Sequence, residues 1–447
     1  MINTFNNILL NIKPSEETQN KITLWLNHLL VVYAFLIPIH DKSKSSLFFV
    51  ILILFVVRMD YMKYLKDAFS NKVVQAFVLF YLVWCFGFLY SDNLEYAQDS
   101  IRKAKYLMFP LLFLTFLDQR FSYRVISAFV LGMLFSELVS YGIRFELFPY
   151  ELYFAGYEVY TTFMDNPSPF FKQIDHNIGL SVVVALLLYQ LLNKSLSLQV
   201  RLLSVFFIIT ASLNMTFIGS RTGYILYLFL ITIVLLITYK KNLTKACLIS
   251  LVIFSILPFL AYSYSDMINK RVDLTLISID KMLHEDYYNS SLGKRIGATK
   301  ESFKVIRENL FFGVGTGDYM DELRNTLSEK NKFIGVISQP HNVYIKTLLQ
   351  FGLFGLFFLF FLFYRLLTYK SIDEYNKGII ILLTLAVMLF MLPGKFYGYF
   401  ILPMFVTLLS AMVVQNNRNI DYKQVDMRTL CMYGFLTFGF LIIGITK

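Results

Sequence analysis

Two histidines, His176 and His341, stand at the starts of apolar runs and could exchange protons there. An imidazole has an unperturbed pKa of about 6.5, so it can act as a general base near neutral pH. We interpret His341, with Asn342 directly after it, as the better candidate for a base. A helix cap or an interfacial position is the alternative for both histidines. His176 follows Asp175, a good capping residue, and we expect it to line a cavity.

Two arginines, Arg221 and Arg295, are candidates for binding phosphate. Arg221 opens an apolar run, and an arginine at the bilayer centre costs about 2.5–3.5 kcal/mol on insertion scales. It must therefore lie at the interface or face an aqueous cavity. A planar guanidinium suits bidentate binding of phosphate. A snorkelling anchor is the alternative for Arg221, and a solvated basic face is the alternative for Arg295, which has many basic neighbours.

Weaker signals for contacts with an anionic substrate come from a basic cluster and from a glycine-rich segment. The basic residues precede an apolar run and are Arg102, Lys103 and Lys105. The glycines alternate in LFFGVGTGDY and are Gly313, Gly315 and Gly317. Backbone amides beside glycine can approach phosphate closely. A tight turn is the equal alternative for this segment.

The residues that commonly hold metal ions do not form a site in the sequence. No Asp-x-Asp pair occurs, which argues against a metal-dependent glycosyltransferase. The three cysteines, Cys85, Cys247 and Cys431, have neither a metal-ligand spacing nor a paired one. We therefore predict that the protein uses no metal and no cofactor.

The composition requires that these residues be positioned by membrane helices. Hydrophobic residues make up 57% of the 447 positions and charged residues 16%, against roughly 45–50% and 25% in ordinary globular chains. The apolar residues come in blocks long enough to span a membrane, and backbone in lipid must be helical. The fold class is therefore predicted as all-α, a polytopic helical bundle. The net charge of +11 reflects loop topology and contact with anionic lipids better than nucleic-acid binding.

The apolar blocks predict about 12–13 transmembrane helices. They run over 22–40, 46–57, 73–90, 106–117, 125–142, 177–192, 202–219, 222–239, 244–262, 342–364, 378–393, 396–414 and 429–446. Placing the N-terminus in the cytoplasm puts the basic-rich short loops inside, as the positive-inside rule requires. Two longer loops, Arg144–Lys172 and 263–341, then face outward.

The chain accordingly divides into three predicted parts. Residues 1–262 hold the N-terminal transmembrane helices, 263–341 form the long outward-facing loop, and 342–447 hold the C-terminal transmembrane helices. Within the loop, KRIGATKESFKVIREN predicts an amphipathic helix, suited to the level of the lipid headgroups. Long loops on one face of a bundle are common places for binding and chemistry.

Three stretches in this order resemble the O-antigen ligase and O-antigen polymerase family of bacterial envelope enzymes. They are IGSRTGYILYLFLITIVLL, KRIGATKESFKVIRENLFFGVGTGDY and QPHNVYIKTLLQFGLFGLFFLFF. Fainter similarities are YSDNLEYAQDSIRKAKYLMFPLL and IDHNIGLSVVVALLL. The combination of order, spacing and a common face gives the resemblance its weight, because no single motif is specific.

The resemblance implies transfer of a glycan from an undecaprenyl-diphosphate carrier to an acceptor sugar, with inversion and without metal. It further implies a multi-pass protein of the bacterial inner membrane whose active site faces the periplasm. In that setting His341 would activate the acceptor hydroxyl, and Arg221 and Arg295 would stabilise the departing diphosphate. The expected substrate-binding residues are Arg102, Lys103, Lys105, His176, Gly313, Gly315 and Asn342.

Several functions of this kind remain open on the sequence. We favour an O-antigen ligase, whose acceptor is lipid A-core. An O-antigen polymerase that joins carrier-linked repeat units is the alternative, as is a protein O-oligosaccharyltransferase. A transporter or flippase for lipid-linked glycans is the alternative of another class, and it would need a basic cavity but no base.

Overall fold

The protein is almost entirely helical, as the sequence predicts. The computed structural model describes residues 13–446, so the first twelve residues of the N-terminal part and Lys447 lie outside the description. The described residues contain eighteen α-helices and one two-stranded sheet, and 74% of them are helical. The prediction of an all-α, polytopic membrane protein is confirmed.

Each predicted apolar block coincides with a helix. These helices are α2 (Glu16–Leu36), α3 (Asp41–Arg58), α5 (Lys72–Phe88), α7 (Phe109–Leu114), α8 (Ser122–Arg144), α9 (Gln173–Asn193), α10 (Leu198–Phe217), α11 (Arg221–Thr238), α12 (Leu243–Tyr264), α16 (Val343–Leu367), α17 (Glu374–Phe390), α18 (Ile401–Val413) and α19 (Met427–Ile445). The remaining helices are α4 (Tyr61–Ser70), α6 (Leu94–Ala104), α13 (Asp266–Glu285), α14 (Ser291–Glu308) and α15 (Tyr319–Asn325). Three short 3₁₀ helices join them: η1 (Lys105–Met108), η2 (Gln119–Phe121) and η3 (Glu329–Val336).

The number of full spans differs from the predicted twelve to thirteen. Within residues 13–446, seven helices are long and apolar enough to cross a membrane, or eight if α3 and α4 form one span bent by 116°. Helices α5 and α18 are apolar but shorter than those seven. The apolar blocks were therefore read correctly as helices, but a block of membrane length in the sequence need not become a straight helix of membrane length.

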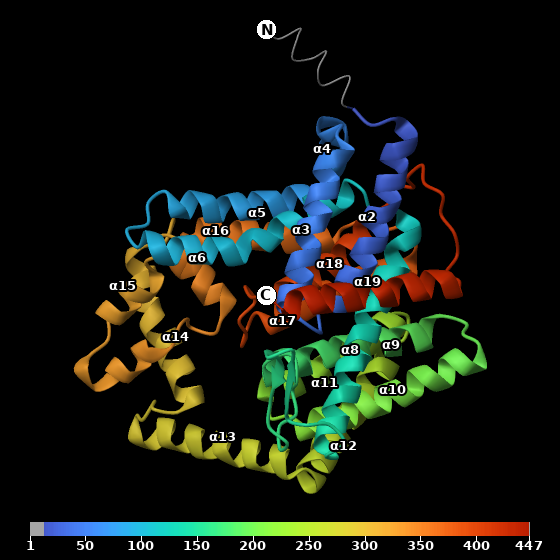
Figure 1. Cartoon of the computed structure of the whole chain (residues 1–447). Coiled ribbons are helices and arrows are strands. Elements are labelled where there is room, and N and C mark those ends of the chain that lie inside the picture. The colour runs from blue at the N-terminus through green and yellow to red at the C-terminus, as the bar shows by residue number, and fades with distance from the viewer. Residues whose placement is uncertain (1–12, 447) are drawn as a thin grey trace.

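Small residues let the central helices approach closely. Helix α11 packs along α9, α2 along α8, and α5 along α16 (Figure 1). A Cβ added at Gly223 of α11 would lie 2.4 Å from the Cβ of Asn177 in α9. Small residues at helix interfaces are the usual means of close packing in membranes, because burial of apolar surface gives no driving force there.

Helix α16 is interrupted at Gly352, whose φ of 59° breaks the regular helix. The chain before α15 fills the break: Leu353 donates its amide to the Leu310 carbonyl at 2.8 Å, and Val314 donates to the Leu349 carbonyl at 2.9 Å. Irregular backbone inside a membrane bundle needs such partners. These bonds fasten the segment 263–341 to the transmembrane helices.

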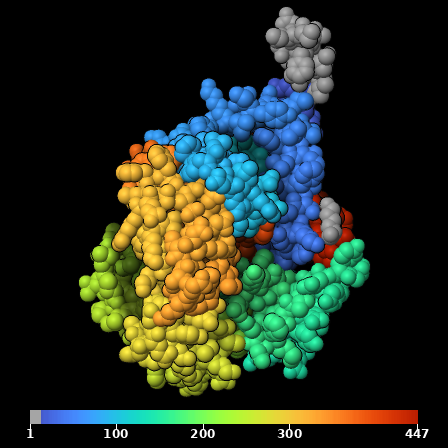
Figure 2. Space-filling model, turned by 90° about the vertical axis from the view of Figure 1, so that its left-hand side faces the viewer, coloured from blue at the N-terminus to red at the C-terminus, as the bar shows by residue number. Residues whose placement is uncertain are grey.

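The segment 263–341 is largely helical and gathers α13, α14 and α15 on one side of the molecule (Figure 1). In Figure 2 its yellow and orange residues form a continuous surface bordered by α6 in light blue and by the teal part of the chain. The predicted amphipathic helix is α14, which packs against α16 through Ala298 and Ile306, while Ile296 and Phe303 are exposed.

The other predicted outward loop contains the only sheet among the described residues. Strands β1 (Glu151–Phe154) and β2 (Tyr157–Thr161) pair antiparallel. The turn between them consists of Ala155 (φ 51°) and Gly156 (φ 84°). Two residues with positive φ suit the twist of a hairpin, and only glycine adopts such angles without strain.

Candidate functional site

Arg221 is placed at the start of α11, where a non-helical segment turns into the helix. Ser220 caps the helix, because its side-chain oxygen accepts a hydrogen bond from the Gly223 amide at 3.2 Å. The half-buried Arg221 donates from Nη1 to the Thr275 hydroxyl in α13 at 2.9 Å. The long segment 263–341 therefore orients an arginine of the transmembrane bundle.

Arg221, Arg295 and His341 come together although they belong to three separate elements. Burial and then the positive charge of Arg221 lower the pKa of Arg295 in α14. Burial, followed by the charges of Arg295 and Lys395, lowers the pKa of His341 to about 3. Charge effects of this kind require that the groups lie near one another. The two arginines and the histidine thus form one cationic cluster.

His341 is held in an unusual backbone conformation. Its φ is 58°, in the left-handed region that residues with a Cβ seldom adopt. Pro340 precedes it, and Asn342 caps α16 by accepting a hydrogen bond from the Ile345 amide at 3.1 Å. Such strain is concentrated at functional sites in proteins. Asn342, which we predicted to contact the substrate, has a structural role at this helix start.

Two cations that the sequence reasoning missed extend the cluster. Arg271 of α13 lies beside Arg221. Its Nε would be 2.8 Å from a Cβ added at Gly219, which stands two residues before Arg221. Lys395 follows α17 and donates from Nζ to the Ser338 hydroxyl at 2.8 Å. The available signal for Lys395 was the segment LPGKFYG, in which glycine and proline put a lysine between two apolar helices.

A third missed cation, Lys346, is enclosed by aromatic rings one turn into α16. Its Nζ lies 5.0 Å from the Tyr319 ring centroid, 5.4 Å from that of Tyr397 and 5.5 Å from that of Trp84. The residue is only 7% exposed. Cation–π contacts compensate part of the cost of burying an ammonium group. Nothing in the sequence spacing indicates this enclosure, because the rings come from three distant segments.

The predicted basic contacts 102–105 lie at the end of α6. Arg102 and Lys103 both bind the carboxylate of Asp99. The Lys105 ammonium lies 5.5 Å from the centroid of the Tyr106 ring and is exposed. The charge of Lys103 acts on Lys395, which connects α6 to the cluster.

His176 is fully buried between α8, α9 and α10. Its ring nitrogens lie 3.3 Å from the Ser136 hydroxyl and 3.2 Å from Asn214 Oδ1. Asn214 in turn donates to Ser140 at 3.0 Å. The geometry places this histidine in a satisfied polar network inside the bundle.

The glycine-rich segment uses its amides inside the protein. Gly313 and Gly315 have φ values of 66° and 103°. The Gly315 amide donates to the Gln350 carbonyl at 3.0 Å, and the Gly317 amide donates to the Ser91 hydroxyl at 3.0 Å. A Cβ at Gly313 would meet the backbone of α16 at 2.5 Å. The geometry favours the tight-turn alternative over a phosphate-binding loop.

A separate cavity of about 450 Å³ lies at the opposite ends of α5 and α16 from His341. Its lining includes Asn71, Arg365 and Tyr369. Asn71 caps α5 there and donates to the Val413 carbonyl at 3.1 Å. This cavity is distant from the cationic cluster, which lies where α11 and α16 begin.

Among residues 13–446, no three His, Cys, Asp or Glu side chains group as a metal site. The fold and the cluster define a multi-pass membrane protein with a strongly cationic site at one end of its helices. Residues 205–360 match the family model described as O-antigen ligase. This range contains Arg221, Arg295 and His341. The match supports assignment of the chain to the O-antigen ligase and polymerase family.

The assignment supports glycan transfer of the O-antigen ligase or polymerase type, within lipopolysaccharide biosynthesis. It implies a lipid-linked glycan as donor and a glycan as acceptor in the membrane. No match was found among curated proteins.

Proposed function

We propose that the protein is an inverting, metal-independent glycosyltransferase that uses a glycan on undecaprenyl diphosphate as its donor. The observation that supports this most directly is the grouping of His341 with Arg221 and Arg295. Guanidinium groups suit a diphosphate, and an adjacent imidazole suits a hydroxyl nucleophile. A transporter would need the cations but would have no use for the base.

The proposed reaction is a single displacement at the anomeric carbon. A ring nitrogen of His341 accepts the proton of the acceptor hydroxyl as its oxygen forms the new glycosidic bond. The bond from the anomeric carbon to the diphosphate oxygen breaks, and its electron pair leaves with undecaprenyl diphosphate. Arg221 and Arg295 stabilise the negative charge that develops on this leaving group.

The lowered pKa of His341 has two consequences for this mechanism. Without a donor the imidazole is neutral at physiological pH, as a base must be, but it is a weak base. A bound diphosphate would offset the charge of Arg295 and raise the pKa of His341 again. Donor binding would thus prepare the histidine to accept a proton.

The acceptor that we propose is lipid A-core, which makes the protein an O-antigen ligase. The proposed site is the periplasmic face of the bacterial inner membrane. Residues 1–262 and 342–447 are proposed as the transmembrane parts and 263–341 as the periplasmic segment. The interaction of Arg221 with Thr275, which lies within 263–341, supports a shared role of these parts.

A reconstituted transfer assay tests the proposal. The purified protein in lipid nanodiscs would receive undecaprenyl-diphosphate-linked glycan and, separately, lipid A-core, a second carrier-linked glycan or an acceptor protein. Glycan attached to lipid A-core is the expected product. Elongated carrier-linked glycan would identify a polymerase, and glycosylated protein would identify an oligosaccharyltransferase. Movement of intact donor across the membrane without transfer would refute the proposed enzyme activity.

A further inference from the structure

Three lysines come together near His341. We call Lys103, Lys172 and Lys395 the lysine group. Lys395 and Ser338 are joined by the hydrogen bond described above, and the Ser338 carbonyl also accepts from the Tyr96 hydroxyl at 2.9 Å. Tyr96 belongs to α6, the helix that also carries Lys103. Ser338 thus links the elements that hold two of the three lysines.

Lys172 is brought to the same place by aromatic packing. It directly precedes α9, and its neighbour Phe171 packs on Phe400 with ring centroids 4.6 Å apart. Phe400 ends the short connection between α17 and α18 that contains Lys395. Partial enclosure, followed by the positive charges of Lys172, Arg295 and Lys103, lowers the pKa of Lys395. The lysine group therefore comes from three elements that are distant in the sequence.

The positive charge of this group is only partly balanced. Within residues 13–446, Lys103 forms a salt bridge with Asp99, whereas Lys172 and Lys395 form none. Asp175 is the other carboxylate near enough to act on Lys395. Arg221, Arg271 and Arg295 likewise have no salt-bridge partner in this part of the chain. Like charges held together without counterions cost free energy, so this arrangement favours anionic ligands.

The donor alone does not account for both groups. A diphosphate diester carries one negative charge on each phosphate, which Arg221, Arg295 and Arg271 can match. The two cations whose charges act on His341 are Arg295, one of the arginines, and Lys395, one of the lysines. If the donor diphosphate occupies the arginines, the lysines near the imidazole remain available to the acceptor.

We propose that Lys395, Lys172 and Lys103 bind an anionic group of the acceptor and so select acceptors that carry negative charge near the reacting hydroxyl. This inference rests on the proposed function, because it takes the arginines as the donor site. The anionic group is a phosphate or a carboxylate on the acceptor sugar, or the diphosphate of a second carrier-linked glycan. All three present oxygens that ammonium groups can bind.

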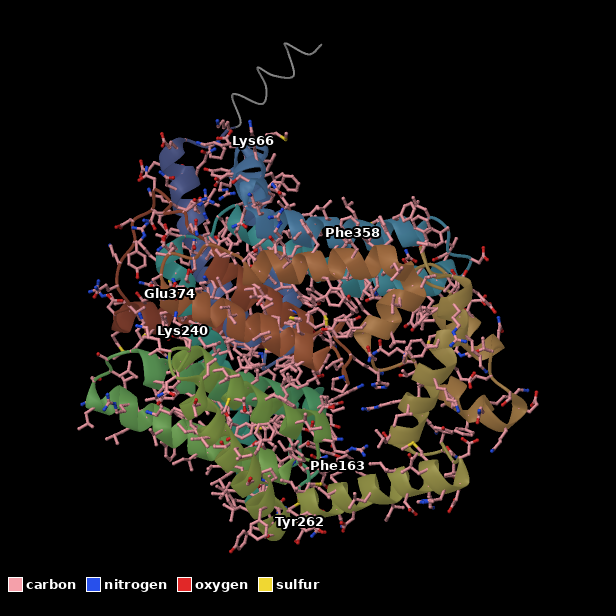
Figure 3. All side chains as sticks on the ribbon, turned by 180° about the vertical axis from the view of Figure 1, so that it is seen from behind. Lys66, Phe163, Lys240, Tyr262, Phe358 and Glu374 are labelled. Carbon is pink, nitrogen blue, oxygen red and sulfur yellow. The ribbon has the colours of Figure 1, made fainter. Side chains whose placement is uncertain are left out.

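Binding is the first test, because it does not depend on turnover. The full-length protein in nanodiscs would be titrated with four probes: an oligosaccharide phosphate monoester, the same oligosaccharide after phosphatase treatment, a uronic-acid oligosaccharide, and an undecaprenyl-diphosphate-linked glycan. Wild type would be compared with Lys395→Gln and Lys172→Gln. The control is Lys240→Gln, since Lys240 binds Glu374 at 2.6 Å at the other end of α11 (Figure 3).

The expected result is tighter binding of at least one anionic sugar than of its neutral counterpart, with a loss on the order of three- to tenfold in either variant. The range is modest because partly exposed ammonium groups are screened by water and salt. Lys240→Gln should bind all probes as wild type does. The probe that loses affinity identifies the source of the anion. Equal binding of charged and neutral sugars by wild type, or equal loss of both in Lys395→Gln, would overturn the inference.

Transfer kinetics separate this inference from the proposed function. Lys395→Gln should raise KM for the anionic acceptor and leave KM for the donor nearly unchanged, whereas kcat should change because the charge of Lys395 also lowers the pKa of His341. An increase confined to the donor KM would assign Lys395 to the diphosphate and overturn the inference while glycan transfer stands. Absence of transfer in wild type, together with selective binding of anionic sugars, would refute only the proposed enzyme activity.

Discussion

Replacing His341 by glycine or by alanine removes the same imidazole, but only glycine relieves the strain in the backbone. His341 has a φ of 58°, a conformation that costs a residue with a Cβ about 1–2 kcal/mol and costs glycine little. Glycine also gains about 0.4–1 kcal/mol of conformational entropy in the unfolded chain, which reduces its advantage. We therefore expect His341→Gly to be about as stable as His341→Ala or more stable, by up to roughly 1.6 kcal/mol.

Both variants should lose transfer equally. Loss of one general base lowers the rate by a factor of about 10²–10⁴. Neither replacement can accept a proton, and donor binding should persist because the arginines are retained. The expected pattern is equal inactivity at unequal stability, which separates the chemical role of the imidazole from any role in folding.

Three measurements on nanodisc samples check this pattern: thermal unfolding, binding of undecaprenyl-diphosphate-linked glycan, and the rate of product formation. Turnover above about a tenth of the wild-type rate in either variant would refute the assignment of His341 as the base. A clearly less stable glycine variant would refute the account of a strained backbone. Loss of donor binding in both variants would move the histidine from the acceptor to the diphosphate.

The remaining predictions concern the arginines, metal and pH. Arg221→Ala should weaken donor binding and turnover, and Arg221→Lys should restore only part of both, because lysine keeps the charge but loses the bidentate fork; unchanged donor affinity in the alanine variant would contradict this. Transfer should survive EDTA, and loss of activity that magnesium or manganese restores would show that the arginines are insufficient. The lowered pKa leaves His341 neutral at any pH above about 3 in the free enzyme, so kcat/KM for the donor should not fall between pH 8 and 5 through protonation of this residue. The acidic limb of the kcat profile should appear at a higher pH, because the diphosphate is then bound. An acidic limb of the kcat/KM profile near the unperturbed pKa of about 6.5 would contradict the burial of this imidazole.

Side-chain chemistry local in the sequence predicted the residues around which the candidate site is built. Arg221 opens an apolar run, so its charged side chain was expected away from the bilayer centre, and the structure puts it at the start of α11. His341 follows a proline before another apolar run, and the structure puts it just before α16. These signals depend on polarity at the ends of helices. They also hold in the folded protein, because a helix end in a membrane protein must meet water or a polar cavity.

The glycine-rich segment shows where local reasoning was insufficient. Alternating glycines are compatible with a phosphate cradle and with a tight turn, and the sequence does not distinguish them. The tertiary structure does, because the amide of Gly315 bonds to the opened helix α16 and that of Gly317 to Ser91 after α5. Where a backbone amide finds its acceptor depends on which distant segment packs against it.

The length of the apolar blocks by itself determined that this chain is a membrane protein built of helices, because backbone in lipid can form hydrogen bonds only with other backbone groups. Only the tertiary structure decided which cations meet. The sequence gives no sign that Arg271 and Lys395 approach each other's neighbours. They join the cluster because α13 packs beside the start of α11 and because Lys395 bonds to Ser338. Electrostatic interaction depends on distance in space, and separation along the chain does not fix that distance.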